Sequence, residues 1–388
     1  MSRHRRVALA SIGLVGALVS VLGSAAAADP VKGDGRLDDP LRQTGVITGN
    51  LHGVAAPPQV AADSWLVADA DTGEILAAKR AKIEHPPAST MKVLTALAVV
   101  HRLAADQPVT VGSEVNSVDG TRVGLVPGHE YSVNDLMTAL LIASGNDAAE
   151  ALAAAAGGRD ATLAAMRSEA ARLQANDTVP GTPSGLDAPG QHTTAYDLAL
   201  FGRAALDDPE VAKYLTVPKA TVHSAGTKSF QISNHNPLLG VYPGMIGVKA
   251  GYTTQAEATY IGAAQRNGHR IIVTLMFAYP RFRPAATALL NWGFDAVGKV
   301  EPVSRLAPAL TPTLATSRDR HTSLNSAATG KANAAPSRNS GSRSGTQRRL
   351  LDIAAALALV LAALRWRVTL LRRRRRHGAR SRLTLPRR

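Results

Sequence analysis

The chain has 388 residues, and the 45% that are hydrophobic are enough to bury one or two cores, which excludes a wholly disordered protein. Its formal charge of +15 comes from the last 87 residues, which hold 19 Lys and Arg against two Asp. The rest of the chain is near neutral, which argues against nucleic-acid binding, because that function requires a basic face. The lack of cysteine excludes disulfides, thiol nucleophiles and thiolate metal ligands.

Residues 1–28 have the three parts of a secretory signal: a basic start, an apolar middle and small residues before Asp29. We therefore predict a signal peptide. An uncleaved anchor is disfavoured because the apolar middle is short for a bilayer span. Residues 29–60 are rich in Gly, Pro, Asp and Ala without periodicity, which predicts an N-terminal extension. Regular structure is expected from about Ser64, within one folded domain over 61–301.

The first expected elements are a strand pair and a buried helix. Residues 65–68 and 75–78 are apolar and flank a Gly turn, which predicts a β-hairpin. The run 89–103 follows a Pro-Pro pair, contains neither Gly nor Pro, and has apolar residues at helical spacing. A small hydroxyl residue after prolines is typical of a helix start, so we predict a helix beginning at Ala88 or Ser89. Further helical patterns make the middle of the chain α-rich: 133–143, 148–156, 161–174 and 195–206.

Strand patterns return in the last third of this domain. Residues 246–251 predict a short strand, and the segments 259–264 and 270–277 flank Asn267-Gly268, a strong hairpin signal. Residues 284–297 then predict a closing helix. A strand pair, a helical middle, further strands and a final helix together predict an α/β domain with one sheet covered by helices.

The C-terminal part has a different composition. Residues 302–349 are dominated by Ala, Ser, Thr, Pro, Gly and Arg, which predicts a disordered linker. Residues 350–371 contain a late apolar run, and 372–388 begin with five consecutive arginines. This order predicts a transmembrane helix with a basic cytoplasmic tail, hence a single-pass membrane protein with its folded domain outside. An interfacial helix on anionic lipid is the alternative, because the uncharged core of the run is short.

The first motif that suggests chemistry is Ser89-Thr90-Met91-Lys92, an S-x-x-K pattern at the predicted helix start. Residues three apart share a helix face, so the Lys92 amine should lie beside the Ser89 hydroxyl. The helix N-terminus also favours developing negative charge there. This is the geometry of an activated serine. Alone the pattern is weak, because a capping serine with a surface lysine has the same letters.

Two further patterns follow in order along the chain. Ser144-Gly145-Asn146 lies between two predicted helices, where a loop can present both polar side chains. Lys249-Ala250-Gly251 lies on a predicted strand and matches K-T-G at two of three positions. S-x-x-K, S-x-N and K-x-G in this order, on a helix, a loop and a strand, form the pattern of β-lactamases and penicillin-binding proteins.

With these residues the chain resembles the low-molecular-mass penicillin-binding proteins that are serine-type D-alanyl-D-alanine carboxypeptidases of peptidase family S11. The resemblance spans about 64–297 and includes segments outside the three motifs: Asp147-Ala148-Ala149, Gly185-Leu186-Asp187-Ala188 and Trp292-Gly293-Phe294. It implies an antiparallel β-sheet flanked by helices, with an α-rich subdomain. It also implies removal of the terminal D-Ala from peptidoglycan stem peptides ending in D-Ala-D-Ala, inhibition by β-lactams, and a catalytic domain on the cell-wall side.

The resemblance assigns roles to the motif residues. Ser89 would attack the carbonyl between the two D-alanines, and Lys92 would be the base. Since a free lysine is protonated at neutral pH, Lys92 must be desolvated or near another cation, for which Lys249 is the evident candidate. Ser144 is expected to pass a proton toward the leaving amine, and Asn146 to orient Lys92 and the substrate amide.

Substrate binding is expected along the third motif and the residues after it. The residues assigned to binding are Lys249, Gly251, Tyr252, Thr253 and Arg281. Backbone N–H groups of Ser89 and Tyr252 would form the oxyanion hole. Ala250 departs from the family's usual Thr and removes a hydroxyl near the substrate carboxylate. Thr253 and Arg281 are expected to replace that contact, with Thr254 and Arg283 as alternatives.

No metal and no cofactor is expected, because the histidines lack H-x-x-x-H or H-E-x-x-H spacing. Two other functions stay open. A β-lactamase uses the same three elements but adds a carboxylate for the deacylating water, and no E-x-x-L-N segment occurs between Asn146 and Lys249. A catalytically weak binding protein of the same fold is suggested by Ala250 and opposed by the intact motif residues.

Overall fold

The computed structural model describes residues 39–311, apart from 225–228 and residue 280. The predicted signal peptide over 1–28 and the predicted membrane helix and basic tail over 350–388 lie outside these residues. Within the described part of the chain, no helix is both long enough and apolar enough to cross a bilayer.

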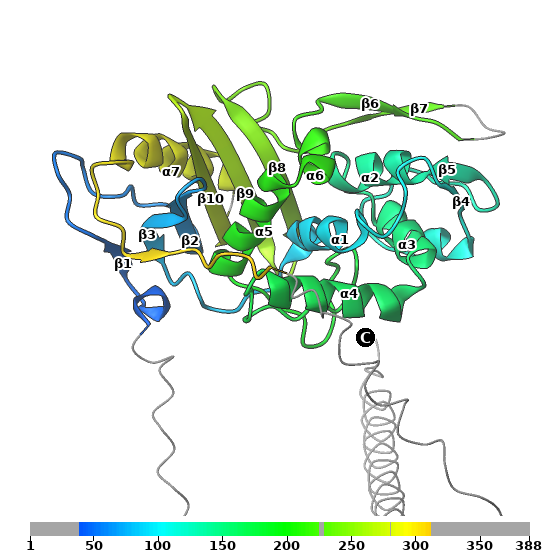
Figure 1. Ribbon diagram of the computed structural model, residues 1–388, viewed down its shortest axis with the longest axis horizontal. Helices are drawn as coiled ribbons and strands as arrows, with labels where there is room; N and C mark the ends of the chain where they lie inside the picture. Colours follow the sequence, from blue (N-terminus) through cyan, green and yellow to red (C-terminus); the bar gives the residue numbers. More distant parts are fainter. Residues whose placement is uncertain (1–38, 225–228, 280, 312–388) are drawn as a thin grey trace, which may run out of the picture. The chain divides into compact units, whose positions relative to one another are not determined.

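Seven of the described strands form one antiparallel sheet: β1 (Val46–Thr48), β2 (Ala62–Asp69), β3 (Glu74–Lys79), β8 (Met245–Thr253), β9 (Glu257–Arg266), β10 (His269–Ala278) and β11 (Ser304–Arg305). The order across the sheet is β1-β3-β2-β10-β9-β8, and β11 also pairs with β3 (Figure 1). The strand β8, which carries the third motif, is therefore at one edge of the sheet.

Both faces of the sheet are buried, which is why its central strands are apolar almost throughout. In β2, Trp65 packs into one hydrophobic core and its neighbour Leu66 into the other, as the two-residue period of a strand requires. Helix α7 (Phe282–Ala296) packs on the first face, and α5 (Ala195–Asp207) packs on the second (Figure 1). The sheet is thus the middle layer of three.

The other described elements form the α-rich part of the domain. The helices are α1 (Met91–Val99), α2 (Val133–Leu141), α3 (Asn146–Ala155), α4 (Arg159–Arg172) and α6 (Pro209–Leu215), and the 3-10 helices are η1 (Pro40–Arg42), η2 (Ala88–Thr90) and η3 (Ser113–Asn116). Two small hairpins complete it: β4 (Pro108–Thr110) with β5 (Glu130–Ser132), and β6 (Lys219–Val222) with β7 (Phe230–Ser233).

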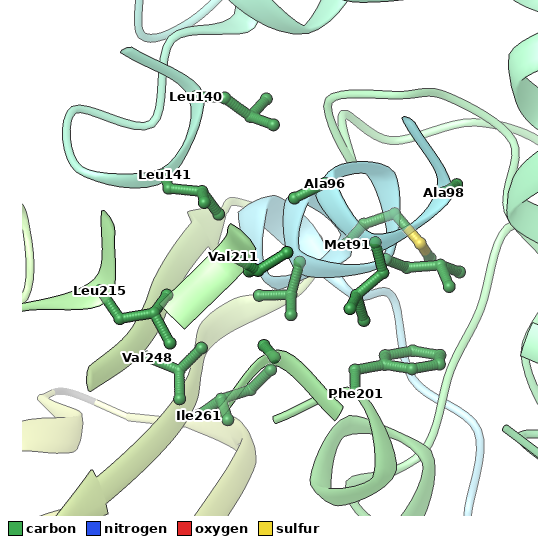
Figure 2. Packing of buried hydrophobic residues seen from close by; sticks show 14 of the residues in the cluster. Met91, Ala96, Ala98, Leu140, Leu141, Phe201, Val211, Leu215, Val248 and Ile261 are labelled. Carbon is green, nitrogen blue, oxygen red and sulfur yellow. The ribbon is translucent and has the colours of Figure 1, made fainter. Parts of the chain in front are cut away.

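Helix α1 is the best-buried helix near the motifs, since all nine of its residues are buried. Figure 2 shows Met91 of α1 and Phe201 of α5 in the same hydrophobic core as Val248 and Ile261 of the sheet. Fully buried side chains of this size each stabilise the fold by about 1.5–3 kcal/mol. The core therefore fixes the start of α1, where the first motif lies, against the sheet.

The predicted antiparallel sheet with flanking helices and an α-rich part is confirmed. The predicted hairpin at Asn267-Gly268 is present, and both residues have positive φ angles, 51° and 83°, as a two-residue turn of this kind requires. The four predicted middle helices appear as α2, α3, α4 and α5, with ends shifted by a few residues.

Regular structure extends beyond the predicted limits at both ends. The expectation that it begins near Ser64 was wrong, because η1 and β1 precede that residue and β1 pairs with β3. The predicted linker over 302–349 was also wrong at its start, because β11 pairs with β3 and Leu306 is buried. Strands of two or three residues have no period of their own, and their partner strand stabilises them. The predicted helix over 89–103 is shorter, since Ser89 lies on η2 and α1 ends ten residues later.

Candidate active site

Ser89 lies half-buried on η2, the single turn that leads into α1. Two threonine hydroxyls fix this turn, because Thr90 Oγ1 and Thr259 Oγ1 both donate to the Pro87 carbonyl, at 2.6 and 2.8 Å. Thr259 is on β9, so the turn is held to the sheet as well as to its own helix. Ala88 has a φ of +48°, a conformation that persists only where the surroundings fix the backbone. The hydroxyl of Ser89 is thus presented by a rigid turn.

Lys92 is completely buried one helical turn after Ser89. Its Nζ lies 3.0 Å from Ser89 Oγ, 2.6 Å from Asn146 Oδ1 and 2.7 Å from the Ser184 carbonyl oxygen. Burial, and after it the charge of Lys249, lowers the pKa of Lys92 well below its usual range. The sequence suggested desolvation or a nearby cation as the cause of such a shift, and both act on Lys92 here. A neutral amine at this distance can accept the hydroxyl proton.

The edge strand β8 passes directly over the nucleophile turn. A Cβ on Gly251 would lie 2.7 Å from the Ser89 nitrogen and 3.0 Å from the Thr90 nitrogen, so only glycine permits this approach. Lys249 is buried, its Nζ donates to the Ala250 carbonyl at 2.8 Å, and burial lowers its pKa to about 7. The Ala250 side chain packs against the core under α7. The K-x-G segment therefore combines a close backbone approach with a second buried amine.

The second motif, Ser144-Gly145-Asn146, lies between the end of α2 and the first residue of α3. Ser144 is buried with a φ of +60°, and Asn146 is the first residue of α3, not a loop residue as predicted. The Asn146 amide donates from Nδ2 to the Asp119 carbonyl at 2.6 Å, which leaves Oδ1 to face Lys92. The hydrogen bonds of the described residues do not include one from Ser144 Oγ to Lys92. The structure therefore joins Asn146 to Lys92 directly, and Ser144 only through its place on the same turn.

A segment that the sequence did not assign to catalysis closes the site from the other side. The Ser184 carbonyl accepts from Lys92, and a Cβ on Gly185 would overlap the Ala88 carbonyl oxygen. Gly185 also has a positive φ of 79°, so both space and conformation require glycine. Because every residue has a backbone carbonyl, the sequence could not show that the Ser184 carbonyl accepts from Lys92. The only sequence signal for this segment was the resemblance of Gly185-Leu186-Asp187 to the family.

The predicted binding residues after Gly251 are more exposed. Thr253 Oγ1 donates to Asp187 Oδ1 at 2.9 Å, which joins the end of β8 to the Gly185 segment. Tyr252 is 65% exposed. Arg281 is exposed at the N-terminal cap of α7, and the ion pairs and hydrogen bonds of the described residues do not connect it to Ser89.

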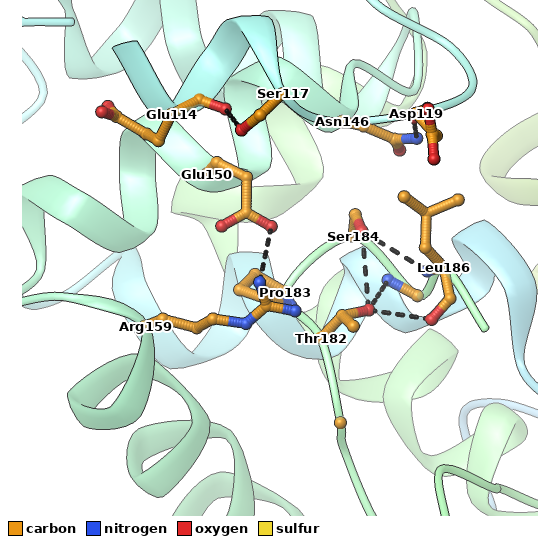
Figure 3. A network of polar contacts seen from close by, with 12 residues as sticks. Glu114, Ser117, Asp119, Asn146, Glu150, Arg159, Thr182, Pro183, Ser184 and Leu186 are labelled. Carbon is orange, nitrogen blue, oxygen red and sulfur yellow. Dashed lines mark hydrogen bonds and ion pairs between the residues drawn. The ribbon is translucent and has the colours of Figure 1, made fainter. Parts of the chain in front are cut away.

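A polar cavity of about 490 Å³ lies beside Asn146 at the start of α3, and Figure 3 shows several of the side chains that line it, among them Glu150 and Ser184. Its lining includes Asp119, Glu150, Arg159, Ser184 and Asp187. Within the described part of the chain, no group of three His, Cys, Asp or Glu side chains is placed to hold a metal ion. The chemistry that the site offers is a serine hydroxyl beside a desolvated amine, next to backbone N–H groups, which suits acyl transfer.

Comparisons with known proteins agree with this chemistry. Residues 52–279 match the profile of peptidase family S11, described as D-alanyl-D-alanine carboxypeptidase. The chain is 40% identical over 244 residues to D-alanyl-D-alanine carboxypeptidase DacB2 of Mycobacterium tuberculosis, covering 61% of this chain and 84% of that protein. It is 33% identical over 265 residues to D-alanyl-D-alanine carboxypeptidase DacD of Escherichia coli, covering 64% and 67%.

Solved structures show the same fold. A crystal structure of a D-alanyl-D-alanine carboxypeptidase from Mycobacterium tuberculosis H37Rv superposes with a TM-score of 0.62 at 37% identity, covering 68% of this chain and 100% of that chain. The crystal structure of the Streptomyces K15 DD-transpeptidase gives a TM-score of 0.60 at 25% identity, covering 62% and 100%.

Proposed function

The chain belongs to peptidase family S11 and is a D-alanyl-D-alanine carboxypeptidase, and from this premise we propose that its reaction runs through an acyl-enzyme on Ser89. The observation that carries the proposal is the distance of 3.0 Å between Lys92 Nζ and Ser89 Oγ. Because burial lowers the pKa of Lys92, its amine can act as a base at neutral pH. We assign Ser89 as the nucleophile and Lys92 as its base.

In the acylation step, Lys92 takes the Ser89 proton while Oγ bonds to the carbonyl carbon between the two D-alanines. Backbone N–H groups of Ser89 and Tyr252 stabilise the oxyanion, and one such donor contributes about 3 kcal/mol to the transition state. Ser144 relays the proton from Lys92 to the nitrogen of the leaving D-alanine as the C–N bond breaks. An ester between Ser89 and the shortened peptide remains.

In the deacylation step, a water molecule attacks the ester carbonyl and gives a proton to Lys92. The bond between Ser89 Oγ and the acyl carbon breaks, Oγ recovers a proton, and the shortened peptide leaves with the new carboxylate. A β-lactam ring opens by the same attack on its amide carbonyl. Its ester on Ser89 is then the inhibited form of the enzyme.

The proposed substrate is a peptidoglycan stem peptide that ends in D-Ala-D-Ala. Its terminal carboxylate needs cationic and hydroxyl partners at the end of β8. Lys249 and Thr253 are supported by their place on this strand, next to the nucleophile turn. Arg281 supplies a further exposed cation. Asn146 is assigned to orient Lys92 through Oδ1 and the substrate amide through the second hydrogen of Nδ2, since the first is donated to Asp119.

We also propose where the reaction takes place. The predicted export signal over 1–28 and the apolar segment over 350–371 support a chain held by one helix, with the catalytic domain on the cell-wall side. The basic tail over 372–388 supports a cytoplasmic C-terminus, because arginines are retained on that side of the membrane.

The test uses the purified full-length protein and two matched peptides, one ending in D-Ala-D-Ala and one in L-Ala-L-Ala. Free alanine should appear only with the first, and a penicillin adduct should map by mass spectrometry to the peptide that contains Ser89. Ser89→Ala should lose both signals and keep the thermal unfolding midpoint of the parent. An adduct on Ser144, or alanine release by the Ser89→Ala protein, would overturn the assignment.

A further inference from the structure

Asp147 follows the second motif directly and has no role in the reaction described above. Its side chain is 1% exposed, and its carboxylate accepts backbone N–H groups from a loop that lies more than twenty residues away. The donors are Val123 at 3.1 Å, Gly124 at 2.9 Å and Leu125 at 3.2 Å, with Ala148 of its own helix at 3.0 Å. Three of these four donors belong to the loop, so the Asp147 carboxylate joins the loop to the start of α3.

The glycine of the second motif makes room for this carboxylate. A Cβ on Gly145 would lie 2.8 Å from Asp147 Oδ1 and 3.2 Å from Val123 Cγ1. The φ of Gly145 is −59°, so space and not backbone conformation requires glycine here. In the sequence Ser-Gly-Asn-Asp, Ser144 and Asn146 are therefore the motif residues, whereas Gly145 leaves space for Asp147 to bind the loop.

The loop that Asp147 holds is also the loop that orients Asn146. The Thr121 carbonyl accepts the Asn146 backbone N–H at 2.7 Å, and the Asp119 carbonyl accepts its Nδ2 at 2.6 Å (Figure 3). The second bond decides which end of the amide faces Lys92, because Nδ2 is committed to the loop and Oδ1 remains. If the loop moved away, the amide would be free to turn.

We propose that Asp147 is a positioning residue for the carboxypeptidase reaction, which folds the loop over 119–125 onto α3 and thereby fixes Asn146 against Lys92. The inference rests on the proposed function of Ser89 and Lys92. Asp147 touches neither substrate nor reacting atoms, and acts through Asn146.

Its charge gives Asp147 a second effect that a purely structural residue would lack. The charged groups that act on Lys92 are Lys249 on β8, which lowers its pKa, and Asp147 and Glu150 on α3, which raise it. His235, before β8, is a further titratable group in range of Lys92. Removing the charge of Asp147 therefore lowers the pKa of Lys92 further. The acid limb of the pH profile, where Lys92 is protonated, should move to lower pH.

The experiment measures kcat, KM and the pH profile of kcat/KM for D-alanine release by the full-length Asp147→Asn protein. We expect kcat to fall by about 10- to 100-fold, as for a misplaced catalytic group. The acid limb should move to lower pH. Hydrogen exchange by mass spectrometry should show lost protection in the peptide that covers 119–126, with the rest of the domain unchanged.

Two further variants separate position from charge. Gly145→Ala presses on Asp147 Oδ1 without removing a charge, so kcat should fall while the acid limb stays in place. Glu150→Gln removes a charge near Lys92, and among the described residues the Glu150 side chain has no hydrogen bond to a backbone group. The acid limb should therefore move to lower pH while kcat is retained.

The inference is overturned if Asp147→Asn keeps the parental kcat, or if its loss of kcat comes with unchanged exchange in 119–126. It is also overturned if the acid limb of Asp147→Asn stays at the parental pH while that of Glu150→Gln moves to lower pH. The parental protein distinguishes this failure from a failure of the proposed function. If penicillin labels Ser89 of the parent and Asp147→Asn still turns over normally, only the role of Asp147 is wrong.

Discussion

Lys92 and Lys249 are both completely buried, and the charge of Lys249 lowers the pKa of Lys92. The hydrogen-bond acceptors of both amines among the described residues are neutral oxygens: a hydroxyl, an amide and backbone carbonyls. A buried ammonium without a carboxylate partner destabilises a fold. The burial that lowers the pKa of Lys92 therefore comes at a cost in stability.

A first prediction concerns the base. Lys92→Arg should reduce the rate of penicillin acylation by at least about 100-fold, because a guanidinium stays protonated and cannot accept the Ser89 proton. The measurement is labelling by fluorescent penicillin over time. Lys213→Arg, an exposed position on α6, is the matched control and should acylate at the parental rate. Near-parental acylation of Lys92→Arg would show that another group takes the proton.

A second prediction concerns stability and pH. The pKa of Lys249 is about 7 in the folded protein and about 10.4 in an unfolded chain. The unfolded state thus binds more protons between pH 7 and 10, so the stability of the parent should rise with pH in that window.

The variant Lys249→Met tests this, because methionine cannot titrate. Its unfolding free energy should be higher than the parent's at pH 7, and the two values should converge near pH 10. Urea unfolding at three pH values checks this, with the exposed Lys219→Met as control. A parental pH slope in Lys249→Met would contradict it.

At the scale of elements, the contact between β8 and η2 sets the geometry of the nucleophile. A third prediction follows from it. In Gly251→Ala the new Cβ meets the backbone of Ser89 and Thr90, which cannot yield as a side chain can. We expect penicillin acylation to slow by about 100-fold. Gly45→Ala, where no atom lies within 4 Å of the added Cβ, should acylate normally. Equal rates in both variants would mean that the turn adjusts freely.

Elements with a period of their own could be predicted from the sequence. The middle helices and the hairpin at Asn267-Gly268 carry local patterns that tertiary contacts reinforce. Strands β1 and β11 could not, because each has at most three residues and depends on pairing with β3. Helix α6 and the β6–β7 hairpin were not predicted either. Segments of seven and four residues are too short to show a clear hydrophobic periodicity.

The residues of the candidate site could likewise be predicted only in part. The side chains in the spaced motifs could be predicted from the sequence, and the structure places Ser89, Lys92 and Asn146 in contact. Backbone partners could not, since the carbonyls of Asp119 and Ser184 have no sequence signature. Asp147 belongs to a segment that resembles the family, but the sequence does not show that its carboxylate binds the loop over 123–125. That contact forms only in the folded structure.

For the whole molecule, a fourth prediction concerns the membrane. The full chain should stay with membranes in high salt, whereas a chain truncated before Leu350 should be released and still produce D-alanine, because the apolar run over 350–371 is then absent. Cell fractionation with a carbonate and salt wash measures this. Replacement of the arginines over 372–376 by Gln is the control for the alternative interfacial helix. If that replacement releases the chain in salt, the segment lies on the membrane and does not span it.

The pairing of β1 and β11 with the same strand determines where a linker or tag joined to the domain leaves the sheet. Both ends of the described domain reach the sheet at β3, whereas the site lies at β8, four strand spacings or about 19 Å away across the sheet. Outside the sheet, the N-terminal end is held by the Arg42–Asp177 ion pair and the C-terminal end by the hydrogen bond from the Leu310 N–H to the Arg172 carbonyl. Within the sheet, β8, which lies over Ser89, is the strand farthest from β3. A tag or linker joined at either end of the described domain therefore enters the sheet at β3, on the side of the sheet opposite to β8, the strand that lies over Ser89.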